Sequence, residues 1–336
     1  MIPSLEYLQR CAADTGYQIS PLEKVVRLVE MASDISRHPY LGEALALKGG
    51  TALNLCYGTP RRLSVDLDYN YIAHISRERM LADRPRVEDT LTELAKRHNY
   101  RIQKSADAFA GSKMFLRYRS VMGQEERIEI DLNFLFRLPL TEIEKHEAWQ
   151  PGDLDRPVIR VVGLSDLLTG KLLAFLDRCA ARDAWDLAYL PEPAIRMLRS
   201  KDFRGHFIAL SATLEHPLRD YTYDRLKKLL TERRITEQLL PMLSTALKPN
   251  AGKLIEKAWA RSVPLLKLEN HEEEYIDAVQ EGILRLDLLF PGNLEEAERL
   301  FFHPAIQWKI QNVKSYQSRK KPKSNHVRKR MDRKED

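Results

Sequence analysis

The sequence contains little cysteine: Cys11, Cys56 and Cys179 are the only three in 336 residues. Their odd number and wide spacing argue against a disulfide framework and a zinc site, so we expect three reduced, buried thiols in a cytoplasmic protein. The sequence also has no apolar run that approaches the roughly 20 residues needed to cross a bilayer. Its first residues lack the basic start and apolar stretch of a secretory signal. We therefore expect a soluble protein that does not act on membranes.

Several common catalytic motifs are missing as well. The nine histidines are scattered and none stands in an HExxH spacing, so none is assigned a catalytic role. Lys48 lies beside a glycine pair, but the GxxxxGK[ST] spacing of a P-loop is absent, which argues against a P-loop ATPase. A serine or cysteine nucleophile has no histidine partner nearby in the sequence.

Charge is balanced over most of the chain and concentrated at one end. The formal net charge is +6, and residues 319–336 hold nine Lys or Arg against three Asp or Glu, which accounts for the whole excess. We expect residues 316–336 to form a basic, disordered tail. Such a tail either binds along the phosphate backbone of a nucleic acid or only keeps the protein soluble, and the sequence leaves both open.

The length of the chain favours two domains. Helical spacing of apolar residues predicts early helices at 4–14, 21–36 and 76–98. Apolar alternation and β-prone residues predict strands at Tyr100–Lys104, Lys113–Val121, Arg127–Phe134 and Val158–Val162. From Ser165 almost to residue 315 the pattern is helical. We expect an α+β core over 1–160 and a helical C-terminal domain over 161–315.

The segment LKGGTALNLCYGTPRRLSVDLDYNY, residues 47–71, is the most informative part of the chain. Its pattern predicts a turn, a short helix, a loop and a strand. Gly49, Gly50 and Thr51 place backbone N–H groups at a helix start, where an anion such as a phosphate is favoured. A glycine pair alone is a weak signal, because most glycine pairs mark turns.

Carboxylates on the predicted strands form a candidate metal site. Asp66 and Asp68 share one strand face because side chains alternate, and adjacent carboxylates repel unless a cation lies between them. Such oxygen ligands suit Mg²⁺, which is usually held by one or two carboxylates and substrate phosphates. Asp131 alone would be a solvent-facing strand residue, but beside Asp66 and Asp68 it would complete a two-metal site. Ser64 would share that face, where it either contacts phosphate, is modified or caps a local turn.

A cationic cluster lies in the stretch KLLAFLDRCAARDAWD, near the start of the helical half. A continuous helix would place Lys171, Arg178 and Arg182 roughly on one face, suited to a triphosphate or an RNA backbone. Asp183 and Asp186 would position the arginines or the attacking group. The other interpretation is an ordinary surface helix with ion pairs between its own residues.

Three motifs stand together in this chain: KGGTALN at 48–54, RLSVDLD at 62–68, and the Lys, Arg and Asp cluster from 171 to 186. With the helix LEKVVRLVEM and the late segment HPAIQWK, they resemble the AbiEii/AbiGii family. Its members are nucleotidyltransferase-like toxins of bacterial type IV toxin–antitoxin and phage-abortive systems, to which the MenT toxins are related. The resemblance implies a DNA-polymerase-β-like nucleotidyltransferase core with a mixed sheet, followed by a helical C-terminal domain.

The resemblance also implies an activity and its parts. The protein would move a nucleoside monophosphate from an NTP to RNA, most often the 3′ end of tRNA, and so inhibit translation and growth. An antitoxin encoded nearby would be its partner, and Mg²⁺ its metal. The expected residues are catalytic Asp66, Asp68, Lys171 and Asp183; nucleotide-binding Gly49, Gly50, Thr51, Ser64, Lys171, Arg178 and Arg182; and metal-binding Asp66, Asp68 and Asp131. The third metal ligand, Asp131, is inferred from the wider superfamily.

Two other functions remain open from the sequence. In the first, the chain is still a nucleotidyltransferase, but its acceptor is a protein hydroxyl or a small molecule. In the second, the chain would be a non-catalytic relic that binds RNA or a partner. The presence of all four expected catalytic residues together speaks against a relic, and the basic tail speaks against a small-molecule acceptor.

Overall fold

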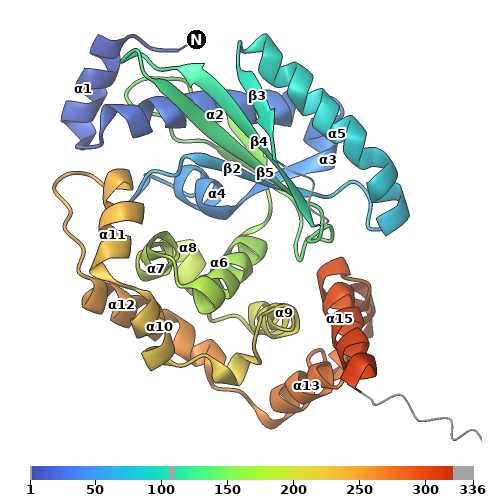
Figure 1. Cartoon of the computed structure of the whole chain (residues 1–336). Helices are drawn as coiled ribbons and strands as arrows, with labels where there is room; N and C mark the ends of the chain where they lie inside the picture. Colours follow the sequence, from blue (N-terminus) through green and yellow to red (C-terminus); the bar gives the residue numbers. More distant parts are fainter. Residues whose placement is uncertain (1, 106–109, 321–336) are drawn as a thin grey trace, which may run out of the picture.

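The computed structural model describes residues 2–105 and 110–320 of the chain. The seven strands of these ranges form one mixed sheet, in the order β3-β4-β5-β2-β1-β7-β6 (Figure 1). The strands are β1 (Leu45–Lys48), β2 (Asp66–Tyr71), β3 (Arg101–Lys104), β4 (Gly111–Arg119), β5 (Glu125–Asn133), β6 (Glu144–Glu147) and β7 (Val158–Val161). β2 pairs with β5 and β1 with β7 in parallel, and the remaining pairs are antiparallel.

One face of this sheet is apolar and packs on helices. The helices of the N-terminal half are α1 (Leu5–Thr15), α2 (Ile19–Arg37), α3 (Leu41–Ala44), α4 (Gly49–Cys56) and α5 (Arg77–Arg97). Side chains at every second position of β2 and β5 are buried in a shared core with α2 and α5: Leu67, Tyr69, Tyr71, Ile128, Ile130 and Leu132. Because side chains alternate, the residues between them face the other side of the sheet.

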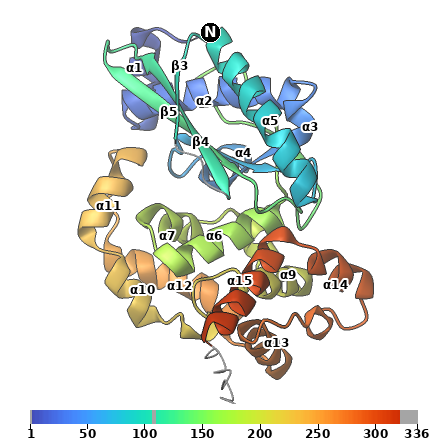
Figure 2. The ribbon, with the colours of Figure 1, turned by 45° about the vertical axis from the view of Figure 1, so that its right-hand side comes forward.

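The C-terminal half of the described chain is helical, as expected. Its α-helices are α6 (Leu164–Arg178), α7 (Ala181–Ala188), α8 (Glu192–Met197), α9 (Lys201–Ser211), α10 (Tyr223–Leu229), α11 (Glu232–Gln238), α12 (Ala251–Leu266), α13 (Asn270–Gln280), α14 (Leu294–Phe301) and α15 (Pro304–Lys320). Short 3₁₀ turns are η1 (Leu218–Asp220), η2 (Leu240–Met242) and η3 (Leu286–Leu288). Figure 2 shows α6 and α7 close below the sheet, with α10, α12 and α13 farther from it.

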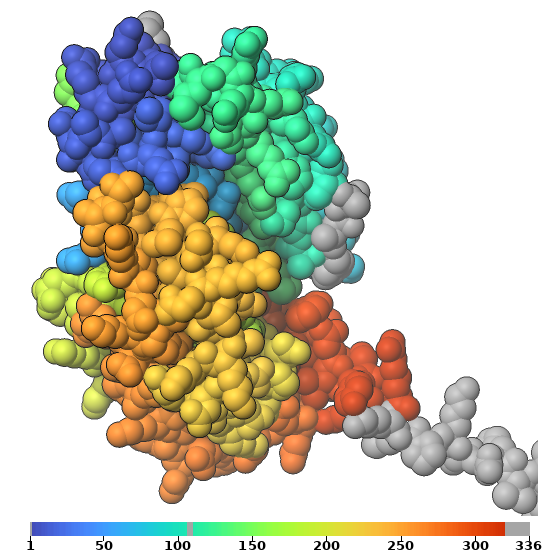
Figure 3. Space-filling model, turned by 60° about the vertical axis from the view of Figure 1, so that its left-hand side comes forward, coloured from blue at the N-terminus to red at the C-terminus, as the bar shows by residue number. Residues whose placement is uncertain are grey.

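The two halves are in contact. Leu53 of α4 and Leu140 belong to the apolar core of the helical half. The Leu63 N–H donates to the Met242 carbonyl, and the Thr245 N–H donates to the Gly16 carbonyl. Figure 3 shows the blue and green N-terminal half lying against the yellow and orange helices. The boundary predicted between 160 and 161 falls near the end of β7, three residues before α6 begins, and the division into two domains stays a prediction.

Several expectations are corrected or completed by the fold. β1 and β6 were not predicted, because LALK has no alternation and EKHE has no apolar residue to mark an edge strand. α15 runs to Lys320, so residues 316–320 are helical and not part of a disordered tail; residues 321–336 lie outside the described chain. The three cysteines are free and buried, as predicted. Within the described ranges no helix is long and apolar enough to cross a membrane.

Candidate active site

The sheet face opposite α2 and α5 is polar where β2 and β5 run side by side. Asp68 lies directly opposite Asp131, and Asp66 lies opposite Glu129. The two acidic strands are therefore neighbours, about 4.8 Å apart, which is the condition that Asp131 needs to share a site with Asp66 and Asp68. Burial raises the pKa of Asp66 despite the opposing effect of the nearby Arg182, and Asp68 raises it further. Negative charge is therefore crowded on this face.

The glycine pair begins α4 and leaves no room for side chains. Gly49 has a φ of 74°, a left-handed conformation that favours glycine, and a Cβ there would stand 2.3 Å from Asp68 Oδ2. A Cβ on Gly50 would stand 2.6 Å from Arg62 Nη2 and 2.9 Å from Ser64 Oγ. The helix start thus lies against the acidic sheet face, with first-turn N–H groups that favour an anion.

Two hydroxyl residues of the predicted nucleotide site are buried. The Thr51 hydroxyl donates to the carbonyl of Asp66 and so ties α4 to β2. Ser64 is 5% exposed and precedes β2, which begins at Asp66. Ser64 therefore lies just outside the strand that carries the acids, and its Oγ lies beside Gly50. The expectation that it shares their face stays a prediction. The roles of Thr51 and Ser64 in nucleotide binding stay predictions.

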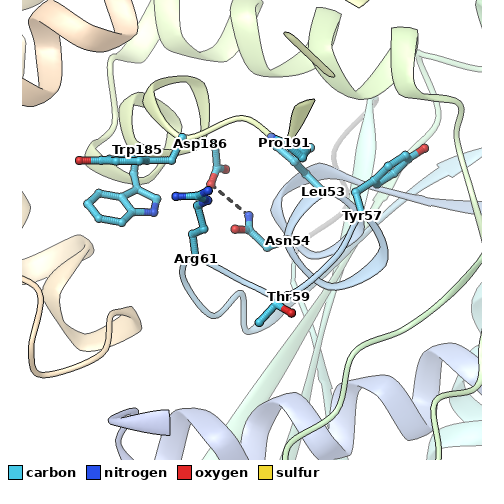
Figure 4. Close-up of a pocket in the computed structure, with 9 residues that line it drawn as sticks. Leu53, Asn54, Tyr57, Thr59, Arg61, Trp185, Asp186 and Pro191 are labelled. Carbon is cyan, nitrogen blue, oxygen red and sulfur yellow. Dashed lines mark hydrogen bonds between the residues drawn. The ribbon is translucent and has the colours of Figure 1, made fainter. Parts of the chain in front are cut away.

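A buried ion cluster joins the two halves beneath α4. Arg62 binds Asp186 through Nε and Nη2, both at 2.7 Å, and Lys171 Nζ lies 2.7 Å from Asp186 and 3.2 Å from Asp183. Burial opposes ionisation, but Arg62 and Lys171 outweigh it and hold the pKa of Asp186 well below its usual range. Asn54 of α4 also donates to Asp186 at 3.0 Å, a bond visible in Figure 4.

The Lys171–Asp186 stretch is two helices and not the continuous one expected. α6 ends at Arg178, and Cys179 has a left-handed φ of 46° before α7 begins. The break turns Arg182 away from Lys171 and Arg178, so that its Nη1 lies 3.2 Å from Asp66 Oδ2. The alignment of the three cations on one helix face is therefore wrong. Lys171 and Arg178 remain together, because both bind Asp183.

Asp183 holds two cations at once. Its Oδ1 accepts from Lys171 at 3.2 Å and its Oδ2 from Arg178 at 2.7 Å. Burial raises the pKa of Asp183, but Lys171 and Arg178 more than compensate, so the net pKa is lowered. Asp183 is therefore ionised and engaged at both oxygens, in a position to fix the two cations that line the cleft.

The acidic face fits a divalent cation in its chemistry, although cationic side chains stand beside it. In the described part of the chain, no group of three His, Cys, Asp or Glu side chains is gathered closely enough to hold a metal ion. Arg182 pairs with Asp66, and Lys113 Nζ lies 3.1 Å from Asp131 Oδ2. Both are long, partly exposed side chains, so a divalent cation competes with them for carboxylate oxygens. Asp68 opposite Asp131 offers the hard oxygen donors that Mg²⁺ prefers.

A cavity of about 500 Å³ separates the acidic sheet face from α6, α9 and α15. Its lining includes Gly49, Gly50, Asp68, Asp131, Lys171, Arg178 and Asp183. The volume is in the range of small-ligand sites. Seven of the predicted site residues therefore line one cleft, whereas Thr51, Ser64, Asp66 and Arg182 lie around it.

Sequence reasoning gave no role to Arg62, Asn54 and Lys113. Arg62 stands inside the motif RLSVDLD, yet its partner Asp186 is 124 residues away. No local pattern indicates such a pair. Lys113 is an exposed position in the alternating pattern of β4, as is usual for a surface lysine. Only the pairing of β4 with β5 brings it opposite Asp131.

A cleft that offers an anion site beside paired carboxylates suits an enzyme that transfers nucleotidyl groups, because such catalysis consists mainly of positioning and charge stabilisation. Comparison with known proteins agrees with this class. The profile of "Nucleotidyl transferase AbiEii toxin, Type IV TA system" matches residues 34–309. The chain therefore belongs to the AbiEii family of nucleotidyltransferase toxins, and the predicted family and enzyme class are confirmed.

A solved structure supports the fold. The chain is similar to MenT4, a nucleotidyltransferase toxin from Mycobacterium tuberculosis H37Rv, with a TM-score of 0.57 and 19% identity over 87% of this chain and 96% of that one. At this identity the likeness shows the fold alone. It confirms the predicted α+β nucleotidyltransferase core with a mixed sheet, followed by a helical C-terminal region. No curated protein matches the chain in sequence.

Proposed function

We propose that this toxin transfers a nucleoside monophosphate from an NTP to the 3′ end of an RNA, most readily a tRNA, with Mg²⁺ as its metal. The observation that carries the proposal is the meeting of three groups in one cleft. Asp68 and Asp131 face each other on adjacent strands, the start of α4 lies against Asp68, and Lys171 with Arg178 line the opposite wall.

The residues divide the work as follows. The first-turn N–H groups of α4, with Lys171 and Arg178, bind the triphosphate, because an anion is favoured at a helix start and beside cations. Asp183 is a positioning residue, since its two oxygens hold Lys171 and Arg178 in place. The catalytic role expected of Asp183 is then exercised through these cations.

The reaction itself is an in-line displacement. The acceptor 3′ oxygen forms a bond to the α-phosphorus, the bond from that phosphorus to its bridging oxygen breaks, and pyrophosphate leaves. The hydroxyl proton passes to a carboxylate of the sheet face. Asp66, Asp68 and Asp131 would hold Mg²⁺, which when bound supplies charge stabilisation and a polarised acceptor oxygen.

The test is transfer of α-³²P label from each of the four NTPs onto total bacterial RNA. Wild type is compared with Asp68→Asn, which keeps the size of the side chain and removes its charge. Asp89→Asn on α5 is the matched control, because its side chain is 79% exposed and does not line the cleft. We expect label on a tRNA-sized band with wild type and Asp89→Asn, and none with Asp68→Asn.

The other outcomes separate the alternatives. Label on protein, or on a small molecule, would replace the RNA acceptor and keep the enzyme. No label anywhere, together with no NTP binding by calorimetry, would favour a non-catalytic binding protein. Equal labelling by wild type and Asp68→Asn would refute the assignment of this cleft.

The cellular setting is part of the same proposal. An antitoxin is the partner expected of a type IV toxin–antitoxin family, and the cytoplasm is where NTPs and tRNA are found. The growth defect on expression of the toxin should disappear in Asp68→Asn. Deletion of the basic residues 321–336 should weaken RNA transfer and reduce its dependence on salt, if that segment follows the phosphate backbone.

A further inference from the structure

The lining of the cleft is of two chemical kinds. The part that the proposed function uses for the triphosphate and the metal is charged and includes Lys48, Asp68, Asp131, Lys171 and Arg178. The rest is largely apolar and includes Leu135, Phe136, Leu140, Leu173 and Trp308. Two carboxylates also stand there, but they are engaged within the protein: Asp166 accepts from the Leu140 N–H and Asp177 from the Tyr221 hydroxyl. A triphosphate is charged and gains no binding energy from an apolar wall. This second part therefore suits a different group of the ligand.

Helix α6 separates the two kinds of lining. Successive residues turn by about 100° around a helix, so Lys171 and Arg178 lie within about 20° of each other on one flank. Thr169 and Leu173 lie within about 40° of each other on the other flank. Gly170 stands midway, about 100° from both Thr169 and Lys171. All five residues line the cleft.

Neither the backbone nor the packing of α6 requires a glycine at position 170. Gly170 is not among the glycines with positive φ, and a Cβ there would meet no atom of the described chain within 4 Å. A glycine in a helix interior is destabilising relative to alanine. By contrast, Gly49 has both a positive φ and a close neighbour. The space in front of Gly170 is therefore open to the ligand.

Two polar atoms of the cleft lack a protein partner. Asn70 is 6% exposed and Thr169 is 1% exposed, and within the described ranges Asn70 Oδ1 and Thr169 Oγ1 have no hydrogen-bond partner. Buried polar groups are nearly always hydrogen-bonded. Asn70 is on the same face of β2 as Asp68, two residues further along. Both residues line the cleft, so a ligand with a polar edge, reached by a small rotation of each side chain, would satisfy these two atoms.

An aromatic ring is present in the same wall. Trp308 of α15 lines the cleft and is 39% exposed, so part of its ring is available for stacking. A flat ligand with apolar faces and a polar edge matches this set, because bases stack on aromatic rings and hydrogen-bond at their edges.

We propose that the apolar part of the cleft binds the nucleobase of the NTP. Asn70 and Thr169 hydrogen-bond its polar edge, Trp308 stacks on its face, and Gly170 leaves room for the sugar between base and triphosphate. This assignment rests on the proposed nucleotidyl transfer, and it makes Asn70 and Thr169 the residues that select among the four NTPs.

The first test fills the space in front of Gly170. Affinities for the four NTPs and for tripolyphosphate, which has no sugar or base, are measured by calorimetry with Mg²⁺ on Gly170→Ala, Gly170→Val and Gly170→Phe. We expect NTP affinity to fall with side-chain size, by about tenfold or more for Gly170→Phe, and tripolyphosphate affinity to change by less than about twofold. Thermal unfolding checks the fold, and Gly170→Ala should melt higher than wild type.

Two results would overturn the assignment. The first is unchanged NTP binding in Gly170→Phe, and the second is an equal loss of NTP and tripolyphosphate binding. The outcome is separate from that of the transfer assay. Wild type that binds NTPs more tightly than tripolyphosphate but labels no acceptor would refute the proposed transfer and leave the base site standing.

The second test addresses selection. Thr169→Val removes the hydroxyl and keeps the shape, and Thr169→Ser retains the hydroxyl. We expect Thr169→Val to change the relative affinities of the four NTPs, by about tenfold for the base that uses the hydroxyl, and Thr169→Ser to restore the wild-type order. A uniform loss for all four NTPs, or no loss, would show that Thr169 does not contact the base.

Discussion

Replacement of Asp186 by asparagine tests whether the buried ion cluster stabilises the junction of the two halves. The substitution keeps the shape of the side chain and removes its charge. Arg62 would then lose its carboxylate partner, and Lys171 would keep only Asp183, which it shares with Arg178. Because Arg62 joins the loop before β2 to α7, and Lys171 belongs to α6, the loss should weaken the fold as a whole.

The magnitude follows from burial. The side chains of Arg62 and Asp186 are 2% and 0% exposed, and water cannot reach the guanidinium group that loses its partner. Removal of one partner from a buried ion pair typically lowers the free energy of unfolding by about 3–5 kcal/mol. The asparagine oxygen still accepts one hydrogen bond from Arg62, so we expect the lower end, about 3 kcal/mol.

The assay is urea unfolding at pH 7, followed by circular dichroism, on wild type, Asp186→Asn and the exposed control Asp89→Asn. The control should change the free energy of unfolding by less than about 0.5 kcal/mol. A loss below about 1 kcal/mol in Asp186→Asn, or an equal loss in the control, would refute the reasoning.

Acid titration gives an independent check of the same pair. The folded pKa of Asp186 is lowered, so its stabilisation is complete above the unfolded pKa of about 3.9 and is lost as the pH falls below it. The difference between wild type and Asp186→Asn should therefore be constant from neutral pH to about pH 4 and shrink below. A difference that begins to shrink near pH 6 would assign the effect to another group.

Three further predictions concern the glycines, a buried histidine and the acid beside Arg182. Gly49→Ala should lower the free energy of unfolding by more than about 1 kcal/mol, whereas Gly170→Ala should raise it by about 0.5–1 kcal/mol. Urea unfolding measures both, and a change of the same sign in the two variants would contradict the prediction. Burial, aided by nearby arginines, lowers the pKa of His303 to about 3, so stability should fall as the pH drops from about 6.5, by up to ~1.4 kcal/mol per pH unit. His303→Asn should flatten that slope, and an unchanged slope would be evidence against it. Arg182→Gln should free Asp66 and tighten Mn²⁺ binding without nucleotide by about two- to fivefold, measured by EPR titration; weaker binding would mean that Arg182 is no competitor for the acid.

Much of the strand arrangement could be predicted from the sequence. The alternation of Ile128, Ile130 and Leu132 with polar residues predicted β5 and its buried face, which is confirmed. The same period of two placed Asp66 and Asp68 on one face. β6 was not predicted because it is a polar edge strand, held by backbone hydrogen bonds to β7. It buries few side chains, so its sequence has no alternation of apolar and polar residues.

The helix break near Cys179 shows where local patterns fail. A helix end usually carries a glycine or asparagine in the left-handed position, and here a buried cysteine occupies it. The sequence around it continues with helical spacing, so nothing local predicted the turn. The break decides the partner of Arg182, which becomes Asp66 on the sheet and not its neighbours in sequence.

The sequence by itself determined most of the helices and strands, the apolar and polar faces of β2 and β5, the position of the glycine turn and the residue types of the site. These depend on periodicity and backbone freedom, which act over a few residues. The tertiary structure alone decided the partners: Arg62 with Asp186, Asp68 opposite Asp131, and Asn70 in one cleft with the apolar side chains of α6 and α15. A charge removed from water must pair with whichever opposite charge the fold brings near, and that choice is set by packing between residues more than a hundred positions apart.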